Sequence, residues 1–380
     1  MIRRREFLEG AACAALGGLA VGPAWAKSAP SSASRALLVR SLRPENLETP
    51  LEWLDRLIIP NDVFFVRSHF GAPAIDPDLR LHVEGGTHRT LEFARADLEA
   101  MPQRTVTAVL QCAGNGRALH EPRVPGVQWL HGAVGQAAWT GVRLSELLDR
   151  AGVGDGVAHV GLEGSDVVPK PSVPPFHRSI PLARALDPTT LVALRMNGER
   201  LSHAHGAPFR LVVPGWAGDH WMKWLRTIRL QRDEAQGFYM QTAYRLPKNP
   251  VEPGAAVRPE DTVPLTTFPV KSSIARPVAG SRQPRGMQEI AGVAFSGNAP
   301  IAKVEVSVDG GAQWHAAALE GEPGVGRWQV FRHRFRANPG RAVAMARATD
   351  TLGNVQPEHP AWNPSGYFWN AWHRVAWEVA

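Results

Sequence analysis

Apolar and polar residues alternate in short runs over much of residues 49–245, as they do in strands that bury one face. Residues 80–84 (RLHVE), 105–110 (TVTAVL) and 211–213 (LVV) are apolar-rich runs of this kind and predict β-strands. At residues 142–151 the period becomes helical, with three leucines on one side, which predicts a short amphipathic helix. This part of the chain therefore has the pattern of a mixed α+β domain.

After residue 264 the pattern changes to short, alternating segments. Three of them are residues 304–308 (VEVSV), 328–335 and 342–348. Strands of this length and spacing, with a turn at Asp309-Gly310-Gly311, are typical of an antiparallel sandwich of about a hundred residues. Residues 246–264, between the two parts, are rich in Pro and charge and predict a linker.

The chain of 380 residues is long enough for two domains, each with its own core. The patterns divide it into a mixed α/β domain at residues 27–245, the linker at 246–264 and the β-sandwich at 265–380. Residues 27–48 are expected to form an arm at the start of the first domain. The predicted fold class is α+β.

Residues 1–26 have the features of an export signal. Arg3, Arg4 and Arg5 are followed by an uncharged stretch rich in Gly and Ala that ends in the cleavage-site pattern Ala24-Trp25-Ala26. The segment RREFL resembles the twin-arginine motif, which exports folded proteins and often implies a cofactor inserted in the cytoplasm. We expect a periplasmic protein without a membrane anchor, since no later stretch is long and apolar enough to span a bilayer.

Charge and motif content narrow the function classes. The formal net charge of +7 suits an anionic substrate or an acidic partner. Basic runs with interleaved aromatic residues do not occur, so we do not expect nucleic-acid binding. No Cys-x-x-Cys-His sequence occurs either, so we expect no heme.

Cysteine occurs only at Cys13, which lies in the signal, and at Cys112 in the sequence LQCAGNGR. A lone thiol in an oxidising compartment is buried, reactive or bound to a metal, and composition alone favours a buried structural cysteine. The neighbouring residues instead favour a cysteine beside a cofactor, because small residues allow a bulky cofactor to approach the backbone. A thiolate is also a soft ligand that suits softer metals.

Two further segments and a lysine add positive charge and imidazole groups. Residues 64–69 (FFVRSH) place Arg67 and His69 on the same side of an extended segment. Residues 205–210 (HGAPFR) carry a His and an Arg, and Lys223 follows in the sequence MKWL. Each group alone is typical of an ordinary protein surface. Together they could neutralise an anionic cofactor tail and an anionic substrate, the latter through bidentate hydrogen bonds from Arg.

These segments belong to a series of motifs that runs through nearly the whole mature chain. The motifs are FFVRSHF, LQCAGNGR, AAWTGVRL, SIPLARALDP, MNGERL, HGAPFRLVVPGW, MKWL, VSVDGGAQW, NVQP, WNPSG and NAWHRV. Together they resemble the sulfite oxidase family of molybdenum enzymes. The resemblance implies a molybdopterin-binding catalytic domain at residues 27–245 and an immunoglobulin-like dimerisation domain at 265–380, and hence a homodimer.

The resemblance also implies roles for individual residues. Cys112 would be the protein's thiolate ligand to a molybdenum held by one molybdopterin. The residues that match positions along the pterin and its phosphate are Phe65, Arg67, His69, Asp166, His205, Arg210 and Lys223. Those that match the substrate pocket or lie close to the metal are Arg67, Arg117, Trp139 and Phe176.

Two positions depart from the family pattern. Phe176 stands where we align a family Tyr just before SIPLARA, and Ser365 stands where the family motif WNLRG has an Arg. Tyr244 could supply a hydroxyl in place of that Tyr, or it could be a packing residue. The departures are similar to the bacterial heme-free branch of the family, which includes periplasmic sulfite dehydrogenases and the sulfane dehydrogenase subunit of a thiosulfate-oxidising system.

The function that the resemblance implies is oxidation of sulfite to sulfate, with water as the oxygen source and electrons passed to a separate c-type cytochrome. Three alternatives remain open at this point. The first is a sulfane dehydrogenase acting on a carrier-bound persulfide, which the missing charge at Ser365 favours. The others are reduction of a small S-oxide and a cofactor-free binding protein on the same scaffold.

Overall fold

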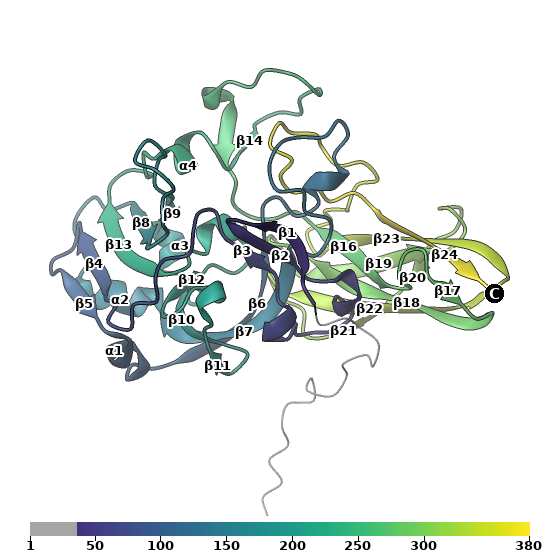
Figure 1. Cartoon of the computed structure of the whole chain (residues 1–380), viewed down its shortest axis with the longest axis horizontal. Helices are drawn as coiled ribbons and strands as arrows, with labels where there is room; N and C mark the ends of the chain where they lie inside the picture. The colour runs from purple at the N-terminus through teal and green to yellow at the C-terminus, as the bar shows by residue number, and fades with distance from the viewer. Residues whose placement is uncertain (1–35) are drawn as a thin grey trace, which may run out of the picture.

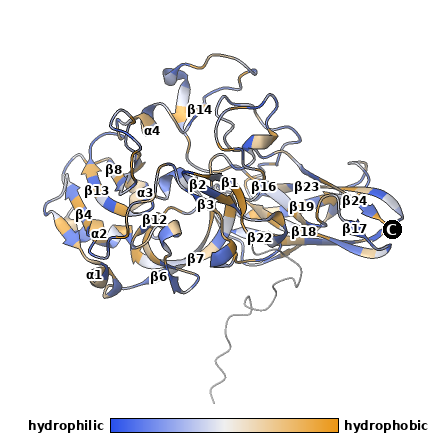
Figure 2. Ribbon diagram, viewed as in Figure 1, coloured by the Kyte–Doolittle hydropathy of each residue, from blue (hydrophilic) through white to orange (hydrophobic). Residues whose placement is uncertain are grey.

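The computed structural model describes residues 36–380, and the predicted export signal lies outside this range. Figure 1 shows two regions side by side, a mixed α/β region and an elongated β-sandwich that ends at the C-terminus. Hydrophobic and hydrophilic residues alternate along the strands of both regions (Figure 2). No helix of the described chain is long and apolar enough to cross a membrane.

Two five-stranded sheets build the first region. One has the order β11-β10-β7-β6 with β12 paired to β10, and the other has the order β5-β4-β13-β8-β9. The first sheet contains β6 (Arg104–Gln111), β7 (Val134–Arg143), β10 (Leu191–Met196), β11 (Glu199–Arg200) and β12 (Arg210–Val212). The second contains β4 (Leu81–Gly85), β5 (Leu91–Phe93), β8 (His159–Gly164), β9 (His177–Pro181) and β13 (Leu225–Gln231). The three predicted strands of this region are confirmed with shifts of one residue at their ends.

The α-helices of the first region are short. They are α1 (Arg95–Glu99), α2 (Leu144–Ala151), α3 (Leu182–Ala185) and α4 (Phe238–Gln241). The predicted helix at residues 142–151 is α2, which begins two residues later because Val142 and Arg143 complete β7. Its side with three leucines is buried, as the helical period requires.

The predicted arm forms part of a sheet. Strands β1 (Leu38–Leu42), β2 (Glu45–Glu48) and β3 (Val66–Arg67) pair in the order β1-β2-β3. In this sheet Asn46 lies opposite Arg67, and its side-chain oxygen accepts a hydrogen bond of 3.1 Å from the guanidinium. The arm therefore helps to fix an arginine that the sequence assigns to the site.

The second region is a sandwich of two sheets, as predicted. The first sheet contains β16 (Lys271–Arg276), β18 (Gly286–Phe295), β22 (Trp328–Ala337) and β21 (Ala318–Glu320). The second contains β17 (Arg282–Gln283), β24 (His373–Val379), β23 (Gly340–Asp350), β19 (Ile301–Ser307) and β20 (His315–Ala316). The three predicted alternating runs coincide with β19, β22 and β23, except that the first run extends one residue past β19. Each run contributes apolar side chains to one core cluster, among them Val304, Phe331 and Ala346. The fold class is thus mixed α+β followed by a β-sandwich.

The predicted linker is more ordered than its composition suggests. Its two ends form the antiparallel strands β14 (Arg245–Pro247) and β15 (Thr262–Pro264). Just beyond β15, the amide of Leu265 donates a 2.9 Å hydrogen bond to the carbonyl of Tyr244. The segment therefore returns to its starting point and fixes the backbone around Tyr244.

The two regions share buried contacts at their junction. The main core cluster of the first region also includes Phe268, Phe295 and Trp328 from the second. The side-chain oxygen of Gln136 accepts a 2.7 Å hydrogen bond from the amide of Trp328, and Arg276 pairs with Asp55 at 2.6 Å. Such continuous packing makes the junction part of the fold.

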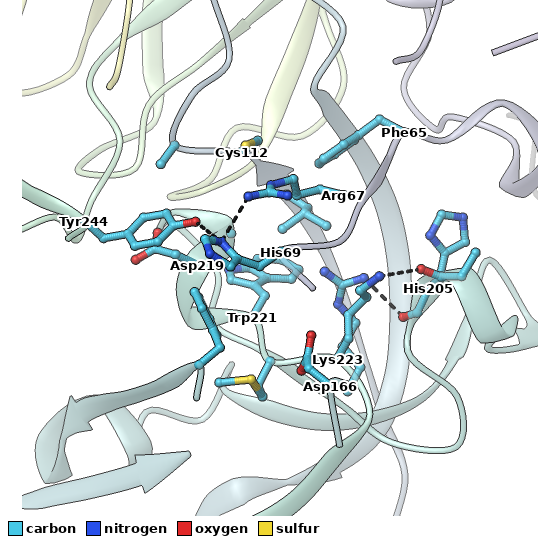
Figure 3. A pocket seen from close by; sticks show the side chains of 17 residues that line it. Phe65, Arg67, His69, Cys112, Asp166, His205, Asp219, Trp221, Lys223 and Tyr244 are labelled. Carbon is cyan, nitrogen blue, oxygen red and sulfur yellow. Dashed lines mark hydrogen bonds between the residues drawn. The ribbon is translucent and has the colours of Figure 1, made fainter. Parts of the chain in front are cut away.

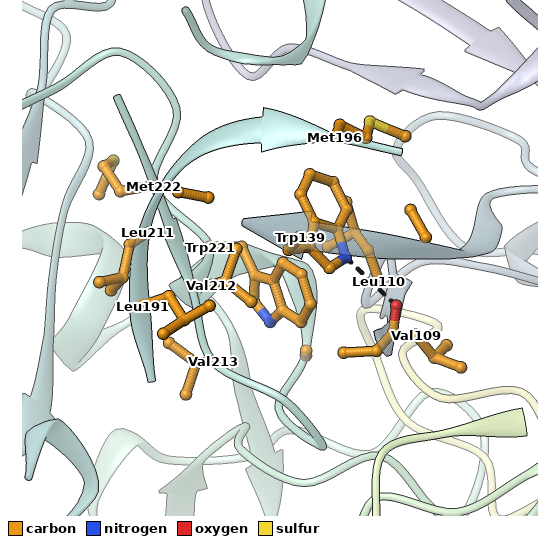
Figure 4. Packing of buried hydrophobic residues seen from close by; sticks show 14 of the residues in the cluster. Val109, Leu110, Trp139, Leu191, Met196, Leu211, Val212, Val213, Trp221 and Met222 are labelled. Carbon is orange, nitrogen blue, oxygen red and sulfur yellow. Dashed lines mark hydrogen bonds between the residues drawn. The ribbon is translucent and has the colours of Figure 1, made fainter. Parts of the chain in front are cut away.

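Indole rings fill the core next to the first sheet. Trp139 on β7 and Trp221 pack edge to face with ring centroids 5.6 Å apart, among the aliphatic side chains shown in Figure 4. The Trp139 ring nitrogen donates a 3.3 Å hydrogen bond to the carbonyl of Ala108. Both indoles are almost completely buried and support the floor of the site described below.

Lys271, at the start of β16, carries a buried amine with no hydrogen-bond partner, and burial lowers its pKa from the ordinary 10.5 to about 7. The unfolded chain therefore binds more protons than the folded chain between those pH values, so stability rises with pH across that window. We expect Lys271→Met to raise the thermal unfolding midpoint most at pH 7 and below, with a gain that shrinks towards pH 10. The same change at Lys303, whose side chain is 55% exposed, should have little effect at any pH. Equal responses of the two variants would contradict this explanation.

Candidate active site

A cavity opens where β3, the C-terminal end of β6, the start of β12 and the segment before β13 meet (Figure 3). About 690 Å³ of space, part of it open to solvent, is free of protein atoms there. Nine predicted site residues line it: Phe65, Arg67, His69, Cys112, Asp166, Phe176, His205, Arg210 and Lys223. They come from segments far apart in the sequence, and the fold brings them to one place.

Cys112 follows the last residue of β6 and lies at one end of the cavity (Figure 3). It is the one free cysteine of residues 36–380, and it is half-buried. The amide of Cys112 donates to the carbonyl of Ala133, and the carbonyl of Cys112 accepts from the amide of Asn115, both at 2.9 Å. Gly116 ends this turn with φ of 92°, and a side chain there would meet Trp369 at 2.8 Å. The tight, small-residue turn thus holds the thiol against the cavity.

Arg67 and His69 lie close together, as their two-residue spacing predicts. The His69 Nδ1 atom is 3.1 Å from the Arg67 guanidinium and 3.0 Å from the hydroxyl of Tyr244. Burial lowers the pKa of His69 to about 3, and the charge of Arg67 adds to the effect. The imidazole is therefore neutral, and since a guanidinium can only donate, Nδ1 is the acceptor.

The other end of the cavity is cationic. The Lys223 amine donates to Ser68 Oγ at 2.9 Å and to the carbonyl of Ala204 at 3.0 Å. Burial lowers the pKa of Lys223 to about 7, and the nearby charge of Arg210 contributes. Burial also lowers the pKa of Arg210 to about 9, and the Nε atom of this side chain is buried without a partner. These groups require an anion to compensate their charge.

Asp166 and His205 complete this end. Burial raises the pKa of Asp166 to about 6, although the charge of Lys223 opposes the shift. Burial lowers the pKa of His205 to about 3, with Arg210 contributing, so the imidazole is neutral. One carboxyl that is hard to ionise does not balance the buried cations, and the positive excess remains.

The residues present fit a molybdopterin. Within residues 36–380 no three His, Cys, Asp or Glu side chains converge on a metal position, so a metal beside Cys112 would need ligands from a cofactor. The thiol supplies one soft ligand at one end of the cavity. The cationic groups at the other end, whose positive charge exceeds that of the nearby carboxyl, suit a phosphate tail. Cys112 would hold the metal, and Arg210 and Lys223 the tail.

Two predicted substrate-pocket residues lie outside the cavity lining. Trp139 is fully buried, and its ring lies 5.2 Å from the guanidinium carbon of Arg210, so it supports that arginine from the core. Arg117 donates hydrogen bonds to the backbone carbonyls of Ser365 at 2.9 Å and Val127 at 3.2 Å. In the described structure, then, neither side chain faces the cavity.

Among the cavity-lining residues that the sequence did not assign to the site, two have titratable side chains. Tyr244 is one, so a phenol lines the cavity although Phe176 lacks one, and the Tyr244 ring also packs against Phe176 with centroids 5.7 Å apart. Asp219 is the other, with one oxygen 2.8 Å from the buried guanidinium of Arg178. Burial raises the pKa of Asp219 to about 7. The sequence around Tyr244 gives no signal of this position, because the β14–β15 pairing sets it.

Comparisons with known proteins agree with this geometry. Residues 69–239 match the family described as oxidoreductase molybdopterin binding domain, and residues 263–380 match the Mo-co oxidoreductase dimerisation domain. Mitochondrial sulfite oxidase of Mus musculus is 37% identical over 90% of this chain, which spans 66% of that protein's length. Sulfite oxidase of Arabidopsis thaliana is 33% identical, and the match covers 90% of this chain and 93% of that protein's length.

A solved structure is also similar. The sulfane dehydrogenase SoxCD of Paracoccus pantotrophus superposes with a TM-score of 0.77 at 30% identity, covering 87% of this chain and 84% of that chain. The two matching domain families, the full-length sulfite oxidase relative and this structural match agree with the free thiol and the cationic cavity. The chain belongs to the sulfite oxidase family of molybdopterin-dependent oxidoreductases.

Proposed function

We propose that this protein oxidises sulfite to sulfate, with water as the oxygen source, and passes the electrons to a separate c-type cytochrome. The observation that carries the proposal is the placement of the Cys112 thiol and the Arg67 guanidinium in one buried cavity. The bound molybdopterin would supply the two-electron redox chemistry. The chain's own residues would bind and orient the anion.

Arg67 is the residue that we assign to the substrate. Its guanidinium can donate to two oxygens of an oxyanion, and its positive charge is already in place before the substrate enters. Asn46 and His69 hold it through contacts of 3.1 Å each. His69 stays neutral because of its lowered pKa, so it positions the arginine without competing for the anion.

The setting of the reaction is also proposed. The export signal expected at residues 1–26 supports a periplasmic location, and no part of the proposal requires a heme in this chain. The match of residues 263–380 to a dimerisation domain supports a homodimer. The cytochrome is a proposal from the family resemblance, because electrons need an acceptor outside the chain.

A sulfane dehydrogenase that acts on a carrier-bound persulfide is the second candidate. Ser365 lacks the positive charge that the family motif supplies to the anion pocket, and Arg117 donates to the backbone carbonyl of that same residue. The similar solved structure is itself named a sulfane dehydrogenase. A larger substrate with less charge would suit such a pocket.

Steady-state oxidation tests the proposal. We expect purified, molybdenum-loaded protein to reduce ferricyanide or cytochrome c on addition of sulfite, with rates normalised to molybdenum and saturation at about micromolar sulfite. The sulfate formed should carry one oxygen from isotopically labelled water. Negligible turnover by fully loaded protein would contradict sulfite oxidation and favour the second candidate.

Tyr244→Phe should weaken catalysis without removing the cofactor. Burial raises the pKa of Tyr244, so the phenol is protonated and donates to His69 Nδ1 at 3.0 Å. Loss of one such hydrogen bond is expected to lower kcat/KM for sulfite by up to about tenfold. Tyr239→Phe is a matched control, since the Tyr239 ring also contacts His69, at 4.6 Å, but does not line the cavity. Equal losses in both variants would contradict a specific role for the Tyr244 hydroxyl.

A further inference from the structure

Aromatic rings surround His69 beside the cavity. Phe176, Tyr239 and Tyr244, which we name the aromatic collar, lie with ring centroids 5.0, 4.6 and 6.1 Å from the His69 ring. Within the collar, Phe176 lies 5.0 Å from Tyr239 and 5.7 Å from Tyr244. Each ring thus packs against the others, which gives the collar a fixed shape.

Two rings of the collar form part of the cavity wall. Phe176 and Tyr244 line the cavity and are half-buried, and residues 174 and 175 beside Phe176 are exposed. Phe238, whose ring packs against Tyr239 with centroids 5.1 Å apart, is 45% exposed, so apolar surface continues from the collar to the solvent. Because Phe176, Tyr244 and Arg67 line the same cavity, an anion held at Arg67 can place a hydrocarbon group against these rings.

Two arginines near the collar are already engaged. Arg178 is fully buried and pairs with the Asp219 carboxylate at 2.8 Å, which compensates its charge inside the protein. Two nitrogens of the Arg117 guanidinium donate hydrogen bonds to backbone carbonyls, one of which belongs to Ser365. Of these three arginines, Arg67 is the one that lines the cavity, where it contacts His69. One arginine at the inner edge of an apolar collar suits a monoanion with a hydrocarbon group better than a small dianion.

We propose that the substrate range of this site includes organic sulfinates, RSO2⁻, with the oxyanion at Arg67 and the group R against the aromatic collar. This inference rests on the proposed function and extends it to a second class of sulfur substrate. The reaction is RSO2⁻ + H2O → RSO3⁻ + 2 H⁺ + 2 e⁻. A new S–O bond forms, the C–S bond is kept, and both electrons leave through the bound cofactor to the one-electron acceptor that the proposed function already names.

The collar predicts a dependence of affinity on the length of R. Each methylene removed from water contributes about 0.8 kcal/mol, or roughly fourfold in affinity. A propyl group should therefore bind about fifteen times more tightly than a methyl group. Sulfate, which has no apolar group, should gain nothing from the collar.

Inert sulfonates allow binding to be measured apart from turnover. We would measure the dissociation constants of methane-, ethane- and propanesulfonate, with sulfate for comparison, on the molybdenum-loaded protein. In the native protein, the dissociation constant should fall about fourfold with each added methylene, which we call the fourfold step. Phe176→Ala should lose most of this dependence on chain length, and Phe176→Tyr should keep it. Phe335→Ala, which removes the same ring from the second region, is the matched control and should keep the native step. Thermal midpoints of all variants would check that they are folded.

The outcomes separate this inference from the proposed function. Equal dissociation constants for the three alkanesulfonates in the native protein would overturn the inference, even if sulfite is oxidised rapidly. A step that Phe176→Ala leaves intact would overturn its assignment to the collar. A native step lost in Phe176→Ala, together with oxidation of propanesulfinate to propanesulfonate with two electrons per molecule, would support the inference whether or not sulfite turns over.

Discussion

Replacing Cys112 by Ser is expected to lower turnover per molybdenum by about a hundredfold or more. Loss of a residue that only orients a metal ligand already costs about 10- to 100-fold in affinity or activity, and a direct thiolate ligand should cost at least as much. The hydroxyl of Ser is a harder and far more weakly acidic donor than a thiol, so it is a poor substitute at a soft metal. Cys112 is half-buried at the end of β6 and is the free thiol of the described chain.

The measurement is sulfite oxidation by the two proteins, each normalised to its molybdenum and pterin content. This normalisation separates a loaded but inactive variant from one that fails to retain the cofactor. Either result agrees with the assignment of Cys112 as the ligand. A fully loaded Cys112→Ser protein with native turnover would contradict it.

Removal of the cofactor is expected to cause the second large effect, a loss of thermal stability. Arg210 is buried and Lys223 is half-buried, and desolvation lowers the pKa of both side chains, which means that their charges are poorly compensated in the cofactor-free chain. A bound anion present at a thousand times its dissociation constant would stabilise the fold by about 4 kcal/mol. The cofactor-free protein should therefore unfold at a clearly lower temperature than the loaded protein.

Arg210→Met tests the cause of that difference. Removing a buried, uncompensated charge should raise the unfolding midpoint of the cofactor-free protein, while the fraction of protein that retains molybdenum should fall. The difference in unfolding midpoint between the loaded and the cofactor-free protein should therefore become smaller. The cofactor-free midpoint rises, and the cofactor stabilises the variant less than the native protein. Arg200→Met is the control, because the Arg200 side chain is 63% exposed. It should leave the unfolding midpoints of the loaded and the cofactor-free protein unchanged. If this difference in unfolding midpoint were as large in the Arg210→Met protein as in the native protein, that result would contradict an electrostatic role for Arg210.

Local patterns were sufficient for the parts of the site that depend on chain geometry within a few residues. A two-residue spacing in an extended segment places Arg67 and His69 on one side, and both contact the same cavity. The small residues after Cys112 predict a tight turn, and Gly116 takes the positive φ that such a turn requires. The sandwich strands followed from their period of two.

Other features depend on pairings between distant segments. Tyr244 reaches the cavity because β14 and β15 pair across a segment whose composition predicts a linker. Trp139 lies on β7 with its indole in the core, and sequence alone does not say which face of that strand meets the cavity. Arg117 extends toward Ser365, a contact across 248 residues that no local pattern specifies.

Molybdenum and pterin analysis of the purified protein tests the central claim most directly. The claim is that the cavity between Cys112 and Lys223 holds a molybdopterin. The account predicts close to one molybdenum and one pterin per chain in the native protein, and a marked loss of pterin when Arg210 and Lys223 are both replaced by Met. A folded native protein that contains neither molybdenum nor pterin after expression in a host that makes the cofactor would contradict it.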